Sequence, residues 1–161
     1  MKKLFLLRHG KASSPKAGEK DFDRPLNEKG IAQINQQGQY LQKNYPKFDQ
    51  LILSSAKRTK ETAEIANQQL SIKALISSED LYLADEYSIL TFIKDNANGE
   101  NVLYVGHNFG ISRLASELAR YSISMTTGMM VEFDIDIGEW NQLETNKATL
   151  KSTYAPKINL A

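Results

Sequence analysis

The stretch Leu4-Phe5-Leu6-Leu7-Arg8-His9-Gly10, close to the start of the chain, decides the fold. Its four consecutive apolar residues predict a short buried strand, and the glycine marks the point where the strand gives way to a loop. The stretch Val102-Leu103-Tyr104-Val105-Gly106-His107 has the same pattern. If both are parallel strands of one sheet, His9 and His107 emerge at its carboxyl edge, where open α/β folds bind their ligands.

Strand-like and helix-like segments alternate along most of the chain, as in a mostly parallel sheet covered by helices. Besides the two strands above, the pattern predicts strands at 51–53 and 73–76, and helices that begin after Asn27, after Ser54 or Ser55, near Tyr87 and near Ile111. We therefore expect an α/β three-layer sandwich with a mostly parallel central sheet, helices on both faces and an antiparallel edge strand. The length of 161 residues suits a single domain over 1–161.

Near the end of the chain the apolar period changes to two. Apolar residues alternate there with carboxylates: Val131, Phe133, Ile135 and Ile137 with Glu132, Asp134 and Asp136. This alternation predicts a half-exposed strand, antiparallel and near an edge, with 143–151 as its pairing partner. The carboxylates are interpreted as the wet face of that strand rather than as a metal site.

Composition excludes several classes of function. The chain has 20 basic and 19 acidic residues, so its formal charge of +1 gives no overall field that would attract nucleic acid or an anionic membrane. The absence of cysteine excludes disulfides, zinc-thiolate sites and a cysteine nucleophile. No apolar run approaches the roughly 20 residues that span a bilayer. We expect a soluble, cytoplasmic protein.

Arg8, His9 and Gly10 together suit the handling of a phosphate group. An arginine presents a rigid fork of donors that matches two phosphoryl oxygens, an imidazole offers a nucleophilic nitrogen, and a glycine lets backbone amides approach the anion. The alternative is an exposed turn that holds two polar residues by chance.

Other cationic groups are predicted to lie near the same edge of the sheet. Arg24 stands before Pro25 in the loop after the first strand. Arg58 falls in the first turn of a helix, where the macrodipole disfavours a cation unless an anion binds there; otherwise Lys57 and Arg58 form a solvated basic turn. His107 joins a strand to a helix N-terminus, which favours an anion, or it is a structural histidine. Together these groups predict a phosphate site that needs no metal or other cofactor.

With these residues, the chain resembles the histidine phosphatase superfamily, which is named for its Arg-His-Gly motif. Within that superfamily it resembles the short phosphohistidine phosphatases of the SixA type. The matching segments are Leu7-Arg8-His9-Gly10-Lys11-Ala12, Arg24-Pro25-Leu26, Ser54-Ser55 with Arg58 and Thr62-Ala63, Leu81-Tyr82-Leu83-Ala84, and Val105-Gly106-His107-Asn108. The resemblance implies a phosphoglycerate-mutase-like fold. It also implies His9 as the nucleophile, with Arg8, Arg24, Arg58 and His107 as the phosphate ligands.

The expected chemistry is an in-line attack of His9 on phosphorus, followed by hydrolysis of the phosphohistidine intermediate by water. The attacking nitrogen must be unprotonated, and nearby arginines favour this because like charges disfavour the imidazolium form. The arginines and His107 would stabilise the charge on the equatorial oxygens.

The leaving group indicates the substrate. Superfamily members that act on esters use a carboxylic acid in the stretch between Arg58 and His107 as proton donor. Here that stretch offers Asp85 and Glu86 as candidate proton donors, or both simply begin an exposed helix. Phosphohistidine expels an imidazole with a reference pKa of about 6.5 and needs little acid help. We therefore expect a phosphorylated protein substrate, such as a histidine phosphotransfer domain.

Two alternatives stay open. One is a general or small-metabolite phosphomonoesterase that uses Asp85 or Glu86 as donor, and the other is a phosphate-binding module without catalysis. Loop position alone does not decide whether Lys11, Ser13 or Ser14 touches the phosphate.

Overall fold

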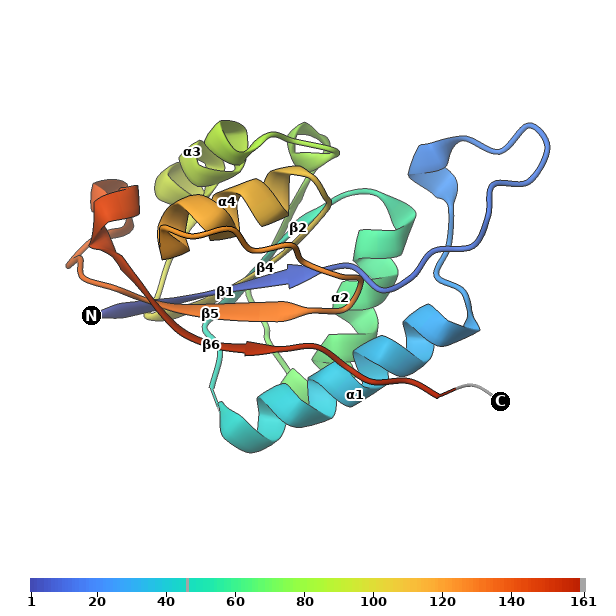
Figure 1. Cartoon of the computed structure of the whole chain (residues 1–161), viewed down its shortest axis with the longest axis horizontal. Coiled ribbons are helices and arrows are strands. Elements are labelled where there is room, and N and C mark those ends of the chain that lie inside the picture. Colours follow the sequence, from blue (N-terminus) through green and yellow to red (C-terminus); the bar gives the residue numbers. More distant parts are fainter. Residues whose placement is uncertain (46, 160–161) are drawn as a thin grey trace.

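A computed structural model describes residues 1–45 and 47–159, and its centre is a six-stranded sheet (Figure 1). The strands are β1 (Lys2–Arg8), β2 (Gln50–Ser54), β3 (Leu75–Ser78), β4 (Asn101–Gly106), β5 (Met130–Ile135) and β6 (Ala148–Tyr154). Their order is β3-β2-β4-β1-β5-β6. The pairs β3/β2, β2/β4 and β4/β1 are parallel, whereas β5 is antiparallel to both β1 and β6. The mostly parallel sheet with an antiparallel edge strand is confirmed.

Within the described residues, four α-helices and four short 3₁₀ helices accompany the strands. They are α1 (Glu28–Asn44), α2 (Lys57–Leu70), α3 (Glu86–Asn96), α4 (Gly110–Ala119), η1 (Asp21–Asp23), η2 (Glu79–Leu81), η3 (Trp140–Gln142) and η4 (Thr145–Lys147). Figure 1 shows α3 and α4 on one face of the sheet and α1 and α2 on the other, as a three-layer sandwich requires. Within residues 1–45 and 47–159, no helix is both long and apolar enough to cross a membrane.

The apolar run of β1 is buried on both faces of the sheet. Leu4 and Leu6 pack in one hydrophobic cluster with residues of α3 and α4, and Phe5 and Leu7 pack in another with residues of α1 and α2. All four side chains are almost completely shielded from solvent. Each buried side chain of this size contributes about 1.5–3 kcal/mol relative to an exposed one, so β1 is central to the stability of both layers.

The register between β1 and β4 places the two histidines side by side. Arg8 lies opposite Gly106 in the parallel pair, and the backbone N–H of His9 donates to the carbonyl of Gly106 at 3.2 Å. His9 and His107 therefore follow the last paired residues of adjacent strands. The strand β2 lies on the other side of β4, so α2 also begins near this edge.

The predicted helix starts are confirmed at α1 and corrected at α2. Asn27 is the N-cap of α1, and its side chain accepts from the backbone N–H of Gly30 at 2.8 Å. The expected cap of α2, Ser54 or Ser55, is wrong, because Ala56 occupies the N-cap position without a side-chain bond. Ser54 is instead the last residue of β2, and its hydroxyl bonds to His107.

The prediction for the last strands needs a second correction. β5 is antiparallel and lies next to the edge strand β6, as expected, but it is not half exposed, because all but one of its residues are buried. Glu132, expected on a wet face, is buried and accepts from Lys3 Nζ at 2.7 Å and from the Tyr45 hydroxyl at 2.6 Å. A buried carboxylate is tolerated when it is paired in this way. The edge strand is β6, which begins at Ala148, five residues after the expected start at 143.

Two glycines of α1 differ in how closely other atoms approach them. A Cβ on Gly30 would lie 2.1 Å from the carbonyl oxygen of Lys11, in the loop that follows His9. A Cβ on Gly38 would lie 3.3 Å from Gln69 Cγ, which belongs to a flexible side chain of α2 that can move aside. Only Gly30 is therefore required for the close approach of two backbone segments.

We predict that Gly30→Ala lowers the free energy of unfolding by about 1–3 kcal/mol, because the backbone of Lys11 must move to admit the methyl group. Gly38→Ala is the matched control on the same helix and should be neutral or slightly stabilising, since alanine has the higher helix propensity. Urea unfolding followed by circular dichroism measures both. Equal effects of the two substitutions would contradict the role given to Gly30.

Candidate active site

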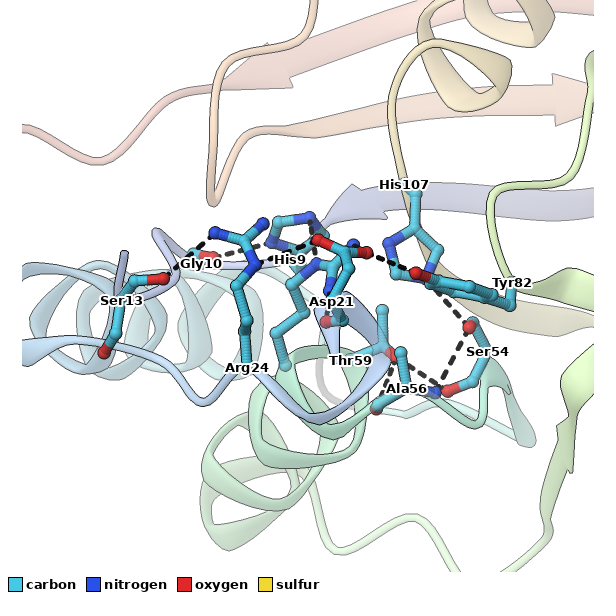
Figure 2. Close-up of polar contacts among 11 residues, drawn as sticks. His9, Gly10, Ser13, Asp21, Arg24, Ser54, Ala56, Thr59, Tyr82 and His107 are labelled. Carbon is cyan, nitrogen blue, oxygen red and sulfur yellow. Dashed lines mark hydrogen bonds and ion pairs between the residues drawn. The ribbon is translucent and has the colours of Figure 1, made fainter. Parts of the chain in front are cut away.

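His9 lies buried at the carboxyl end of β1, and its two ring nitrogens have different partners (Figure 2). Its Nδ1 is 2.6 Å from the carbonyl oxygen of Gly10, and Arg58 Nε donates to its Nε2 at 3.3 Å. Because a carbonyl only accepts and a guanidinium only donates, the proton resides on Nδ1 and the lone pair on Nε2. Nε2 is therefore the nitrogen that can act as a nucleophile.

The surroundings of His9 keep its ring neutral. Burial is the main cause that lowers the pKa of His9 to about 4, and the charges of Arg58, Arg8 and Arg24 lower it further, against the opposing effect of the Gly10 carbonyl. At neutral pH the lone pair on Nε2 is consequently available.

His107 faces His9 from the end of β4. The two ring centroids are 5.2 Å apart, and His107 Nε2 is 2.8 Å from the hydroxyl of Ser54. Burial, followed by His9 and Arg58, lowers the pKa of His107 to about 3. If the Ser54 hydroxyl donates to Nε2, the ring proton of His107 is on Nδ1, which is buried and has no hydrogen-bond partner within the described residues.

Arg8 also carries a buried donor without a partner. Its Nη1 donates to the carbonyl of Met125 at 2.9 Å, whereas its Nε is buried and unpaired within the described part of the chain. Buried donors are almost always paired in folded proteins. Arg8 directly precedes His9, and His107 faces it. The unpaired donor of Arg8, joined by His107 Nδ1 when that nitrogen carries the ring proton, is what a site for an oxyanion requires.

Arg58 is buried in the first turn of α2. Besides its bond to His9, it donates from Nη1 to the backbone oxygen of Asp21 at 2.8 Å and from Nη2 to the carboxylate of Asp21 at 3.1 Å. The Thr62 hydroxyl donates to the backbone oxygen of Arg58 at 2.7 Å and accepts from the N–H of Gly10 at 3.1 Å. Thr62 thereby ties α2 to the Arg-His-Gly stretch.

Arg24 reaches the cluster through a carboxylate. Its Nε donates to Asp21 at 2.9 Å and its Nη1 to the backbone oxygen of Ser13 at 3.0 Å. The sequence did not decide which loop residues contact the phosphate site. Ser13 contributes its backbone carbonyl, which accepts from Arg24. The backbone N–H of Lys11 donates to the side chain of Gln33.

The two candidate proton donors lie outside this network. Asp85 is the exposed N-cap of α3, and its hydrogen bonds with Ser88 lower its pKa, so it is ionised. Glu86 has one carboxylate oxygen that is buried and unpaired within the described residues, and it lines a cavity of about 440 Å³ with Asn108 and Phe109. Within residues 1–45 and 47–159, neither bonds to a histidine or an arginine of the site.

Sequence reasoning did not identify three polar groups of the site: Asp21, Tyr82 and Ser54. The Tyr82 hydroxyl donates to the Asp21 carboxylate, and the Tyr82 ring meets His107 edge-on at a centroid distance of 5.5 Å. Ser54 and Tyr82 do lie in segments that match the family, although no role was assigned to them, and for Asp21 the available signal was its spacing of three residues from Arg24. In the part of the chain that the structure describes, no cluster of three or more His, Asp or Glu side chains could hold a metal ion.

The arrangement combines a neutral nucleophilic imidazole with guanidinium groups and unpaired buried donors, which suits transfer of a phosphoryl group. The sequence pattern of the histidine phosphatase superfamily (branch 1) matches residues 4–82 of this chain. An uncharacterized protein of Mycobacterium tuberculosis is 31% identical, over 94% of this chain and 100% of its own length.

Solved structures agree with this match over almost the whole chain. The structure of a proposed phosphohistidine phosphatase SixA from Nakamurella multipartitia is similar with a TM-score of 0.84 and 26% identity, over 96% of both chains. The protein histidine phosphatase SixA in complex with tungstate is similar with a TM-score of 0.81 and 19% identity, over 95% of this chain and 96% of that one. The chain therefore belongs to the histidine phosphatase superfamily, and it has the phosphoglycerate-mutase-like fold of that family.

Proposed function

We propose that this protein is a metal-independent phosphatase that hydrolyses protein phosphohistidine through a covalent phosphohistidine intermediate on His9. The observation that carries the proposal is the pair of contacts that leaves the lone pair of a neutral His9 on Nε2, beside Arg58. The similarity of 96% of the chain to the structure from Nakamurella multipartitia supports this substrate class.

In the first step, His9 Nε2 attacks phosphorus in line with the bond to the substrate imidazole. A bond from phosphorus to Nε2 forms while the bond from phosphorus to the substrate nitrogen breaks, and that nitrogen keeps the electron pair. Arg58 Nε, which holds Nε2 in the free protein at 3.3 Å, then becomes free for a phosphoryl oxygen. In the second step, the oxygen of a water molecule bonds to phosphorus while the bond from phosphorus to His9 Nε2 breaks. The electron pair returns to Nε2, and the proton lost by the water leaves with the inorganic phosphate or passes to solvent.

The charge that develops on the phosphoryl oxygens has donors ready to receive it. Arg8 Nε is an unpaired buried donor, and His107 Nδ1 is a second one when the Ser54 hydroxyl donates to Nε2. Arg58 and Arg24 add two further guanidinium groups. Such groups need no reorganisation during the reaction and can supply the largest part of the rate enhancement. The roles that the sequence assigned to these residues fit this geometry.

The surroundings of the site favour phosphohistidine over an ester. An ester needs a proton donor for its basic leaving oxygen. Asp85 is committed to the cap of α3, and Glu86 makes no hydrogen bond to the site in the described part of the chain. An imidazole leaving group needs little protonation, because its reference pKa is about 6.5.

The substrate assignment predicts a higher kcat/KM for a phosphohistidine protein, such as a phosphorylated histidine phosphotransfer domain, than for an alkyl phosphate ester such as glycerol phosphate, whose leaving oxygen is strongly basic. Release of inorganic phosphate from both measures it. Asp85→Asn and Glu86→Gln should leave phosphohistidine turnover unchanged. Faster turnover of the ester, with a large loss in either variant, would favour a phosphomonoesterase, and binding of phosphate without any turnover would favour a binding module.

The nucleophile assignment predicts that His9→Ala abolishes covalent labelling by substrate carrying radioactive phosphate. The reason is that the variant has no nitrogen at the position of Nε2. Acid quenching is avoided, because a phosphoramidate bond is acid-labile, and the label is followed on gels at alkaline pH. Asp85→Asn is the control and should label as the unmodified protein does. A label that persists in the His9 variant would assign the nucleophile to another residue.

The neutral state of both histidines predicts a loss of stability in mild acid. The pKa values of His9 and His107 are lowered to about 4 and about 3 in the folded protein, against about 6.5 in the unfolded chain. As the pH falls, the unfolded chain therefore binds protons first. The stability from the neutral histidines is fully present above pH 6.5 and is lost progressively down to about pH 4 for His9 and about pH 3 for His107. At pH 5 each imidazole has lowered the free energy of unfolding by roughly 2 kcal/mol relative to neutral pH.

Urea unfolding at pH 7 and pH 5 measures this effect. The unmodified protein should lose more free energy of unfolding between the two pH values than the double variant His9→Gln/His107→Gln, which has no imidazole to titrate. Asp21, with a pKa of about 2, titrates below this window and does not interfere. An equal loss in both proteins would show that the histidines are not the source.

A further inference from the structure

The carboxylate of Asp21 is held by three groups of the site. It accepts from Arg24 Nε at 2.9 Å, from Arg58 Nη2 at 3.1 Å and from the hydroxyl of Tyr82. Figure 2 shows it between Arg24 and Tyr82, close to His9. Asp21 belongs to η1, in a segment between β1 and α1 that projects from the body of the molecule in Figure 1.

The contact with Arg58 places this carboxylate next to the nucleophilic nitrogen. Nε and Nη2 form one edge of a guanidinium group, the pair of parallel donors that binds two oxygens of a phosphoryl group. In the free protein Nε donates to His9 Nε2 and Nη2 donates to an oxygen of Asp21. A carboxylate oxygen thus occupies a donor that a phosphoryl group on His9 would need.

Charge prevents both anions from sharing these donors. The hydrogen bond from Tyr82 is the main cause that lowers the pKa of Asp21 to about 2; partial burial opposes it, and Arg58 and Arg24 add to it. Asp21 is therefore ionised at neutral pH. An ionised carboxylate and a phosphoryl dianion at hydrogen-bond distance from the same guanidinium repel each other.

We propose that Asp21 is an internal anion that occupies part of the phosphate site, and that a substrate phosphoryl group binds by replacing its carboxylate on Arg58 and Arg24. This inference rests on the proposed function, in that the His9 site must bind a phosphoryl group. It goes beyond that function by naming the residue that sets the affinity of the site.

Replacement of the carboxylate leaves both arginines in position. Arg58 Nη1 remains bound to the backbone oxygen of Asp21 at 2.8 Å, and Arg24 Nη1 to the backbone oxygen of Ser13 at 3.0 Å. A bridge between Ala12 and Leu26 ties the base of the segment that carries Asp21. The side chain can therefore turn away while its backbone still orients Arg58.

Such a displacement has a distinctive signature in binding and in kinetics. If only the fraction of molecules with Asp21 turned away can bind, the apparent Kd of every anion at the site increases by the same factor. The same factor raises KM and leaves kcat unchanged. A residue that merely positions the arginines would instead affect kcat.

The test measures the affinity of the full chain for inorganic phosphate and for tungstate by isothermal titration calorimetry. We expect Asp21→Asn to lower both Kd values by a similar factor, roughly tenfold, and to lower KM for phosphohistidine protein with little change in kcat. Tyr82→Phe, which removes one donor to the carboxylate, should act in the same direction with a smaller effect. Asp23→Asn is the control, since it removes the same charge from an exposed side chain of the same turn.

Unchanged or weaker binding by a folded Asp21→Asn protein, or a loss in kcat, would overturn the inference while leaving the proposed function intact. An equal gain in affinity in the Asp23 control would also overturn it, because the effect would then reflect net charge alone. If neither the unmodified protein nor the variant binds phosphate or tungstate, the proposed function fails together with the inference.

Discussion

The parallel pairing of β1 with β4 is the constraint on which the site depends. This pairing holds Arg8 opposite Gly106, the last residues of the two strands. The residue that follows each strand is a histidine, so both histidines lie at the same edge of the sheet. A slip of one residue would turn every following side chain to the other face. The apolar residues of both strands fill the clusters on the two faces and make such a slip costly, so hydrophobic packing determines where the two imidazoles meet.

Burial and charge act together once this edge is formed. The histidines are buried beside arginines, and burial is the main cause that lowers the pKa of each. The arginines are held by oxygens of the chain: Arg8 by Met125, Arg24 by Ser13 and Asp21, and Arg58 by Asp21. The positive charges therefore stay oriented in the free protein. Much of this order comes from one turn, η1, whose Asp21 accepts from Arg58 of α2 and from Arg24.

The sequence predicted those parts of the structure that depend on local patterns. The apolar run of β1, the cap at Asn27 and the position of His9 and His107 follow from periodicity and from the geometry of parallel sheets. The contacts of Asp21 could not be predicted, because its partners Arg58 and Tyr82 are 37 and 61 residues away. The ion pair of Glu132 with Lys3 spans 129 residues. An alternating pattern therefore wrongly indicated a wet face, since it does not show that a cation covers the strand.

The lowered pKa of His9 has opposite consequences for the two steps of the proposed reaction. A less basic imidazole is a weaker nucleophile, which slows the attack on the substrate, although the lone pair is free at every physiological pH. In the second step His9 is itself the leaving group, and a less basic nitrogen departs more readily from phosphorus. Transfer from a substrate imidazole of ordinary basicity to a buried one of low basicity is uphill, so the arginines and His107 must stabilise the phosphoryl group once it is on His9. For that reason the same arginines that add to the effect of burial on the pKa of His9 are the groups that make the intermediate accessible.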